Sequence, residues 1–192
     1  TVETGGYYNN FTRPGHIQGT ASDNLSDVAF VDITIRRQSD EQYWDGTAWV
    51  AGRVWLRATG TANWQYTFAP DDGETYDVES RATDNAGNVE ISLGSSTFNY
   101  SSSGPAAPEI SSPTHPDEDT WYNDNDPTFN WTPPPSGAGI SGYSYILDQA
   151  PDTEPDLFAD TSGNTRSYTN VADGIWYFHV RALDNAGNWG PP

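Results

Sequence analysis

Arg81-Ala82-Thr83-Asp84-Asn85-Ala86-Gly87-Asn88 occurs a second time, with one change, as Arg181-Ala182-Leu183-Asp184-Asn185-Ala186-Gly187-Asn188. Each copy follows a run that alternates aromatic or aliphatic residues with polar ones, and each run follows an acidic residue and a glycine. This order predicts a turn, a strand and a loop, and in the loop Gly87 and Gly187 are expected to supply a positive φ. The copies lie 100 residues apart, which is far longer than a solenoid repeat and close to the length of one small β-sandwich. The repeat therefore predicts two related domains.

Other segments also predict strands and no helices. In Val28–Arg36, alternate residues fall on opposite faces: Ala29, Val31, Ile33 and Ile35 on one, and Asp32, Thr34 and Arg36 on the other. This is the period of a half-buried strand. The Asp45-Gly46 pair between aromatic flanks is typical of a tight β-hairpin. No persuasive helical periodicity is present, so the sequence predicts an all-β fold.

A Pro/Ser-rich segment at residues 101–116 separates the two halves. Proline at this density disfavours a central strand and favours extended polyproline geometry, so we expect a semi-rigid linker. The expected domains are residues 1–100 and 117–192, each a sandwich of antiparallel strands. After Asn188 only four residues remain. The second domain is therefore expected to lack its last strand, which the chain either omits or receives from elsewhere.

Composition excludes several functional classes. The chain carries 27 acidic and 8 basic residues, a formal net charge of −19. Such a surface repels phosphate backbones and anionic headgroups, so we expect no nucleic-acid partner. No apolar run has the length of a transmembrane helix, so we expect no membrane insertion. Every basic residue is arginine and there is no cysteine, which excludes lysine isopeptide links, disulfides and thiolate metal sites.

Two sets of segments resemble known modules. Tyr76-Asp77-Val78-Glu79-Ser80-Arg81-Ala82, followed by the Asp-Asn-Ala-Gly-Asn phrase, resembles the penultimate strand and last loop of bacterial immunoglobulin-like domains, with Tyr76 at the position of a tyrosine corner. Residues 127–131, 139–145 and 176–182 resemble parts of fibronectin type III-like modules of secreted and cell-surface proteins. The resemblance implies two tandem sandwiches, immunoglobulin-like then fibronectin type III-like, in an extracellular or cell-surface protein.

Oxygen-rich loops make calcium the candidate cofactor, because Ca²⁺ takes about six to eight oxygen ligands. The candidate ligands are Asp23, Asn24, Asp27, Asp84, Asn85, Asn88, Asp117, Asp119, Asp124, Asp126 and Asp184. The alternative is that these residues form Asx turns and solvate their loops. Their spacing is not that of an EF-hand and does not choose between the two.

Aromatic residues provide a second candidate site. Trp44 and Trp49 flank the expected hairpin, and Trp121 and Tyr122 lie in an expected loop, so these four could stack on sugar rings. The alternative is that they pack a thin core. The three histidines lie far apart in sequence, and no nucleophile motif or phosphate loop is present, so we expect no enzymatic activity.

Three functional hypotheses follow. The first is a non-catalytic structural or adhesive segment of a bacterial extracellular or cell-surface protein, a spacer or stalk rigidified by Ca²⁺. Its partners would be neighbouring domains of a longer chain. The second is an accessory module that binds a glycan or a surface protein. The third is a filament subunit, in which Thr1–Phe11 of one copy pairs with the open edge of the second domain of another copy.

Overall fold

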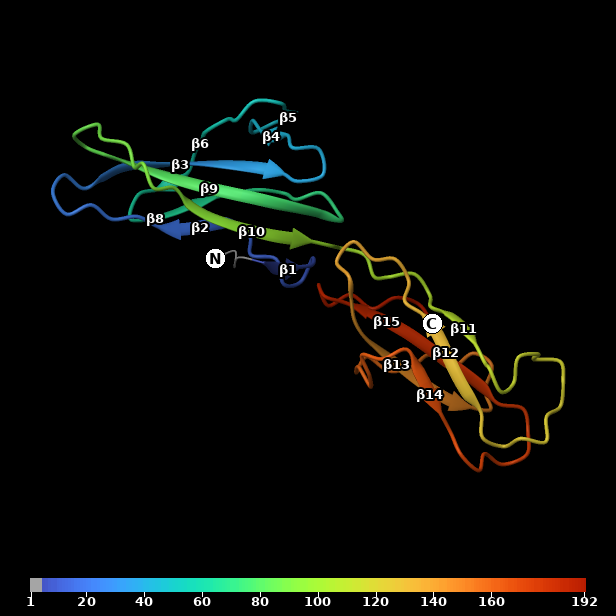
Figure 1. The fold of residues 1–192 in the computed structure, drawn as a ribbon. Helices are drawn as coiled ribbons and strands as arrows, with labels where there is room; N and C mark the ends of the chain where they lie inside the picture. The colour runs from blue at the N-terminus through green and yellow to red at the C-terminus, as the bar shows by residue number, and fades with distance from the viewer. Residues whose placement is uncertain (1–4) are drawn as a thin grey trace. The chain divides into compact units, whose positions relative to one another are not determined.

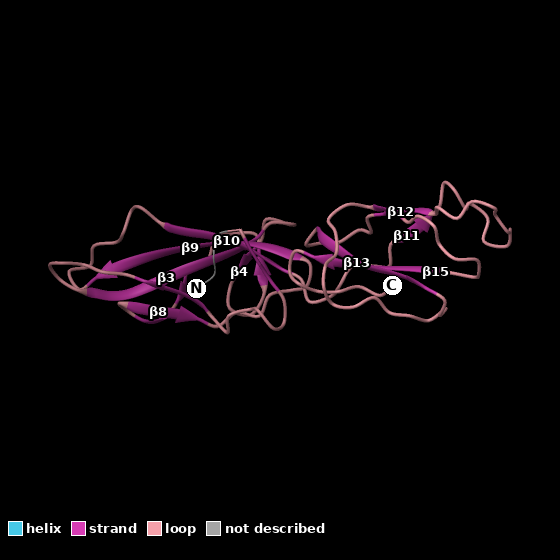
Figure 2. Ribbon diagram, turned by 90° about the horizontal axis from the view of Figure 1, so that it is seen from below, coloured by secondary structure: helices cyan, strands magenta, loops and turns pink. Residues whose placement is uncertain are grey.

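A computed structural model describes residues 5–192 (Figure 1). The chain divides into two compact units, Thr1–Ser102 and Ser103–Pro192, and each is described by itself. Every helix or strand assigned in the described residues is a strand, and Figure 2 shows only strands and connecting loops. The predicted all-β fold is confirmed.

The first unit contains two sheets. The larger runs in the order β1, β10, β9, β3, β4, β5, with β6 paired to β3, and the smaller in the order β2, β8, β7 (Figure 1). The strands of the larger sheet are β1 (Gly6–Tyr8), β3 (Val28–Arg37), β4 (Tyr43–Trp44), β5 (Trp49–Val50), β6 (Leu56–Arg57), β9 (Glu74–Asp84) and β10 (Gly94–Tyr100). Those of the smaller are β2 (Ile17–Thr20), β7 (Thr59–Gly60) and β8 (Asn63–Tyr66).

The core of this unit lies between its two sheets. Ile17 and Trp64 from the smaller sheet pack in one cluster with Ile33, Tyr76 and Phe98 from the larger. Apolar residues that alternate along each strand reach the same face, so both sheets direct one face into a shared core. This is a β-sandwich of the immunoglobulin-like kind that the sequence predicts.

Strand β3 confirms the predicted alternation, with one addition. Val31, Ile33 and Ile35 are 0 to 1% exposed in the core. Asp32 and Thr34, on the opposite face, are also buried. Period-two alternation assigns polar residues to solvent, but here Arg57 contributes to the cover over the outer face, and its Nε donates to Asp32 Oδ1 at 2.7 Å.

Two local predictions are also confirmed. The Tyr76 hydroxyl accepts a hydrogen bond from the Asp71 backbone N–H at 2.7 Å, which is the contact of a tyrosine corner. The Asp45-Gly46 turn joins β4 to β5, with Gly46 at φ 102°. That φ favours glycine because it has no Cβ.

The N-terminal arm is part of the first unit. Strand β1 pairs in parallel with β10, with Gly6 opposite Phe98 and Tyr8 opposite Tyr100. Strand β1 is therefore an edge strand of the larger sheet, and the pairing of the arm with another copy stays a prediction. Residues 1–4 lie outside the described part of the chain.

The second unit also has two sheets. One is β11 (Glu109–Ser111), β12 (Thr128–Thr132) and β14 (Thr165–Ser167); the other is β13 (Ile140–Asp148) and β15 (Tyr177–Asp184). Strand β11 lies within residues 101–116, so part of the segment expected to be only a linker is an edge strand paired to β12. This three-residue strand has one apolar residue and prolines on both sides, so the sequence holds no alternating pattern that would predict it.

Aromatic packing forms the second core. Trp131 and Phe129 from β12 pack on Tyr143 and Phe178 from the other sheet, and the Phe129 and Phe178 rings stack at 4.4 Å. Strand β15 pairs with β13 along one edge. Along its other edge, the described residues contribute only an isolated bridge between Leu183 and Trp189. Strand β9 in the first unit, by contrast, lies between two strands, β3 and β10.

Candidate functional site

The repeated phrase makes the same set of contacts in both units, which we call the loop clasp. Its first part is formed by Asp84 in unit one and Asp184 in unit two. In each, Oδ1 accepts the backbone N–H of the Asn four residues later at 2.8 Å. Oδ2 accepts the side-chain amide of that Asn, at 2.8 Å in the first unit and 3.0 Å in the second. Gly87 and Gly187 have φ of 88° and 87°, which confirms the predicted positive φ at both.

Asparagine at the next position forms the second part of the clasp. The Asn85 backbone N–H donates to the Asp27 carbonyl at 3.1 Å, and its Nδ2 donates to the Ser26 carbonyl at 2.7 Å. Asn185 likewise donates to the carbonyls of Gly139 and Ala138. Asp27 and Gly139 both have positive φ, 57° and 73°. In each unit the clasp therefore ties the loop after the long strand to the loop before the unit's other long strand.

The clasp is closed in one unit and open in the other. Asp184 and Ala186 are 1% and 5% exposed, whereas Asp84 is half-buried and Ala86 is exposed. Since the phrases are nearly identical, the difference comes from what surrounds them. In the first unit the surroundings leave a cavity.

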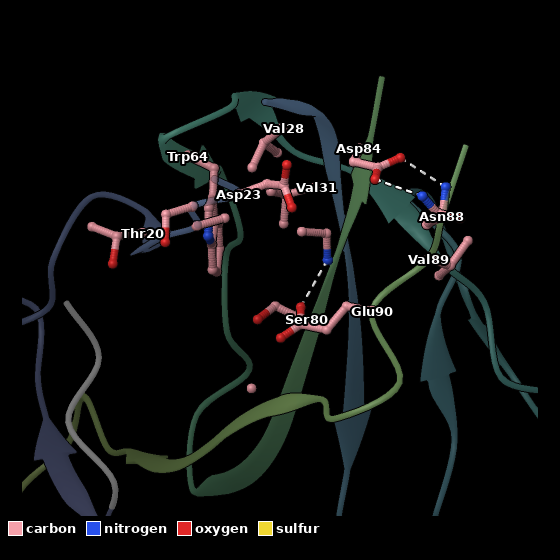
Figure 3. A pocket seen from close by; sticks show the side chains of 14 residues that line it. Thr20, Asp23, Val28, Val31, Trp64, Ser80, Asp84, Asn88, Val89 and Glu90 are labelled. Carbon is pink, nitrogen blue, oxygen red and sulfur yellow. Dashed lines mark hydrogen bonds between the residues drawn. The ribbon is translucent and has the colours of Figure 1, made fainter. Parts of the chain in front are cut away.

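The cavity has a volume of about 540 Å³ and lies at the loop-clasp end of the first unit (Figure 3). Its apolar lining includes Trp64 on β8 and Val28 and Val31 on β3. Its polar lining comes from three hydroxyl groups, one amide and three carboxylates: Thr20, Ser22, Ser80, Asn88, Asp23, Asp84 and Glu90. Trp64 fits because residue 19 is glycine: a Cβ there would overlap the indole ring.

Hydrogen bonds fix the carboxylates of the cavity. Asp23 Oδ2 accepts the backbone N–H groups of Ser26 and Leu25, which hold the pKa of Asp23 below its usual value. The side-chain amide and backbone N–H of Asn88 lower the pKa of Asp84 in the same way. The Ser26 hydroxyl donates to Asp84 Oδ2 at 2.9 Å. Asp23 and Asp84 are therefore held ionised near one another.

Few of the calcium candidates come together. Asp23, Asp84 and Asn88 line the cavity, Asn24 is exposed in the nearby loop, and the carbonyl of Asp27 accepts from Asn85. Within residues 5–192, no three acidic or histidine side chains form a group that could hold a metal ion.

The acidic segment of the second unit forms turns. Asp117 accepts from the backbone of Asp119, Asp124 accepts from the backbone of Asp126, and Asp126 accepts from the backbone of Asn170. These contacts are those of Asx turns and of one loop-to-loop bond, the alternative that the sequence left open. Calcium binding stays a prediction.

Three of the four aromatic residues predicted as sugar-stacking candidates have rings that pack against other side chains. Trp49 stacks on Tyr76 at 5.8 Å, Arg37 lies over the indole at 4.4 Å, and Trp44 packs against the same cluster. The Tyr122 ring contacts His115 and its hydroxyl accepts from the Asp117 N–H. Trp121 is 77% exposed.

Two histidines contact main-chain carbonyls. Nε2 of His115 lies 2.9 Å from the Asp124 carbonyl, and Nε2 of His179 lies 3.0 Å from the Ala150 carbonyl. His179 Nε2 also lies 3.8 Å from a carboxylate oxygen of Asp148. These contacts tie each imidazole to a nearby loop.

Comparison with known proteins gives fold-level likenesses only. No family model matches the chain, and no curated protein sequence matches it. Solved structures that match include the FN1–FN3 domains of chicken CNTN1, at 13% identity and a TM-score of 0.37, covering all of this chain and 61% of that one. They also include SGBP-B of a Bacteroides ovatus mixed-linkage glucan utilization locus, in complex with a mixed-linkage heptasaccharide, at 12% identity and a TM-score of 0.28, covering all of this chain and 42% of that one. The chain thus spans about three fifths and two fifths of their lengths, and at these TM-scores neither likeness carries an argument about function.

The sequence did not reveal Trp64, Ser80 and Glu90 as lining residues of a site. Trp64 and Ser80 lie in segments where apolar and polar residues alternate, and that pattern predicts only which face of a sheet each residue occupies. The available signal was the comparison of the two phrases: position 90 is glutamate after the first and position 190 is glycine after the second.

Proposed function

We propose that this chain is a non-catalytic structural segment of an extracellular or cell-surface bacterial protein, a spacer built from two β-sandwich units. The observation that carries the proposal is the loop clasp, which occurs in both units with the same donors and acceptors. A spacer must keep its length when pulled, and a clasp that fastens two loops at the end of each sandwich opposes the first step of unravelling.

The long ladders of each unit support the same function. Strand β9 pairs with β3 and β10, and β15 pairs with β13 from Ile140 to Asp148. Among residues 5–192, no helical segment has the length and hydrophobicity that a membrane crossing requires.

Single-molecule force spectroscopy tests this proposal. The full chain, held between inert handles, is expected to show two separate unfolding events, each extending the chain by on the order of 300 Å because an extended residue spans at most about 3.6 Å. Asn85→Ala and Asn185→Ala should each lower the force of one event. An extension curve without peaks would contradict the spacer function.

Calcium rigidification remains part of the proposal. A cation that binds only the native state raises the melting temperature by mass action. The measurement is thermal unfolding of the full chain with Ca²⁺ and then with a chelator. Identical curves would contradict calcium binding by the native state.

Glycan binding is a second candidate, because Trp121 is 77% exposed. A sugar-stacking role predicts retention on an immobilised polysaccharide that is lost in Trp121→Ala. Trp44→Ala is the contrasting variant, since that ring packs against the core. Equal retention of Trp121→Ala and the unmodified chain would exclude this role.

A further inference from the structure

The cavity of the first unit is not required by the fold of its loop clasp. In the second unit the same clasp is packed closed, with Ala182 fully buried and Gly190 buried at the position that corresponds to Glu90. In the first unit Ala82 and Glu90 line a space of about 540 Å³. Pockets of this size are in the range of small-ligand sites. The comparison within one chain therefore singles out the cavity as an addition to a shared scaffold.

The lining combines anionic and apolar residues. Asp23, Asp84 and Glu90 are its charged residues, and its lining includes no arginine or histidine. Trp64, Val28 and Val31 provide the apolar part (Figure 3). Phosphates, uronic acids and other anions are disfavoured here by charge.

Two carboxylate oxygens remain available in the cavity. Asp23 uses Oδ2 for its turn, and Glu90 uses Oε2 to accept the Ala82 N–H at 2.9 Å. Among residues 5–192, the hydrogen bonds to these two carboxylates go to Asp23 Oδ2 and Glu90 Oε2. Asp23 Oδ1 and Glu90 Oε1 accept no hydrogen bond from these residues. A carboxylate oxygen only accepts, so its complement is a donor, and a positively charged donor gives the stronger bond.

We propose that this cavity binds a primary alkylammonium group, with the ammonium on Asp23 and Glu90 and the aliphatic stem against Trp64 and the neighbouring valines. A bare metal ion fits less well, because these acidic side chains form no group that could hold one. A neutral sugar would leave the charge of the cavity unbalanced.

No lysine side chain of residues 1–192 can supply this ammonium. The chain has no lysine, so neither this chain nor a second copy of these residues carries such a side chain. The two sources are a free amine, such as a polyamine, and a lysine side chain of a partner protein. Both present the same chemistry to the cavity.

Two-dimensional NMR titration of the full chain tests the proposal. The probes are n-butylammonium chloride, n-butanol as its neutral counterpart, 1,5-diaminopentane, N-acetyl-lysine methylamide and CaCl₂. We expect saturable shifts of the Trp64 indole and the Asp23 and Glu90 amides with n-butylammonium, and no saturation with n-butanol. Tighter binding of 1,5-diaminopentane would identify a free amine as the source, and tighter binding of the lysine derivative would identify a protein side chain.

Matched variants separate the cavity from general attraction to an acidic protein. Glu90→Gln and Asp23→Asn keep the acceptors for the backbone but remove one charge, and each should weaken n-butylammonium binding on the order of 10-fold. Asp45→Asn removes the same charge from an Asx turn outside the cavity, where Asp45 accepts the N–H groups of Thr47 and Ala48, and should change the affinity less than about 2-fold. Equal weakening by all three variants would overturn the proposal, and so would shifts of the same residues with n-butanol or with CaCl₂ alone.

Discussion

Asn185→Ala and Asn85→Ala each remove the corresponding side-chain hydrogen bond of the loop clasp. The two bonds differ in how deeply the residue that accepts them is buried. Asn185 Nδ2 donates at 2.8 Å to the carbonyl of Ala138, a residue that is 4% exposed. Asn85 Nδ2 donates at 2.7 Å to the carbonyl of Ser26, which is half-buried. A buried carbonyl that loses its donor remains unpaired, whereas water can reach the Ser26 carbonyl.

The structure therefore predicts unequal losses of stability. Asn185→Ala should lower the free energy of unfolding of the second unit by about 1–3 kcal/mol, and Asn85→Ala that of the first by about 0.5–1 kcal/mol. Since 1.4 kcal/mol is a factor of ten in an equilibrium constant, these values correspond to roughly 5- to 140-fold and roughly 2- to 5-fold changes.

Hydrogen exchange measured by mass spectrometry on the full chain provides the assay, because peptides from β15 and β9 report each unit separately. The amides of β15 should lose protection in Asn185→Ala, and those of β9 in Asn85→Ala. Asn24→Ala, in the exposed loop of the first unit, is the control. Equal losses in the two units, or a larger loss in the first, would refute the assignment of the difference to burial of the acceptor.

Three further predictions concern the first unit and the whole chain. Gly19→Ala should destabilise it by about 1–3 kcal/mol, because the added Cβ overlaps the Trp64 ring. Gly15→Ala, with open space around it, should not, and equal urea unfolding of the two variants would be the contrary result. Burial raises the pKa of Tyr76 above its ordinary value of 10.0, so the unfolded state releases that proton first; stability is full below about pH 10 and falls above it, and Tyr76→Phe should weaken this alkaline loss in a pH series of unfolding curves. The same variant should cost about 1 kcal/mol at neutral pH, since it removes the bond with the Asp71 N–H. Salt should weaken n-butylammonium binding to the unmodified chain, as screening requires, and affinity independent of salt would contradict an ionic site.

Local patterns in the sequence predicted much of the fold. Positive φ at Gly87 and Gly187, the hairpin at Asp45-Gly46 and the hydroxyl contact of Tyr76 all depend on residues close in sequence, and all are present. Strand β11 and the burial of Asp32 depend on partners distant in sequence, namely β12 and Arg57. Patterns within one segment cannot identify such partners.

The candidate site shows the same division. The acidic loops were predicted as possible ligand clusters, but whether carboxylates converge depends on how two loops are fastened together. Asp23 and Asp84 meet through Ser26, and Glu90 lines the same cavity. The phrase that identified the two units also marks the site, but only through the residue that follows it.

In the described residues the second edge of β15 carries only an isolated bridge, and this has a consequence for how the protein behaves at high concentration. A strand edge without a full partner can pair with another chain, and Ile175, which precedes β15 in sequence, is 61% exposed. The second unit carries two arginines against 13 acidic residues, a net charge of −11, so two copies approaching edge to edge repel each other. This electrostatic repulsion slows association of the second units and so opposes aggregation. Light scattering should therefore show association when salt is raised or when the pH is lowered toward about pH 4, where carboxylates become protonated.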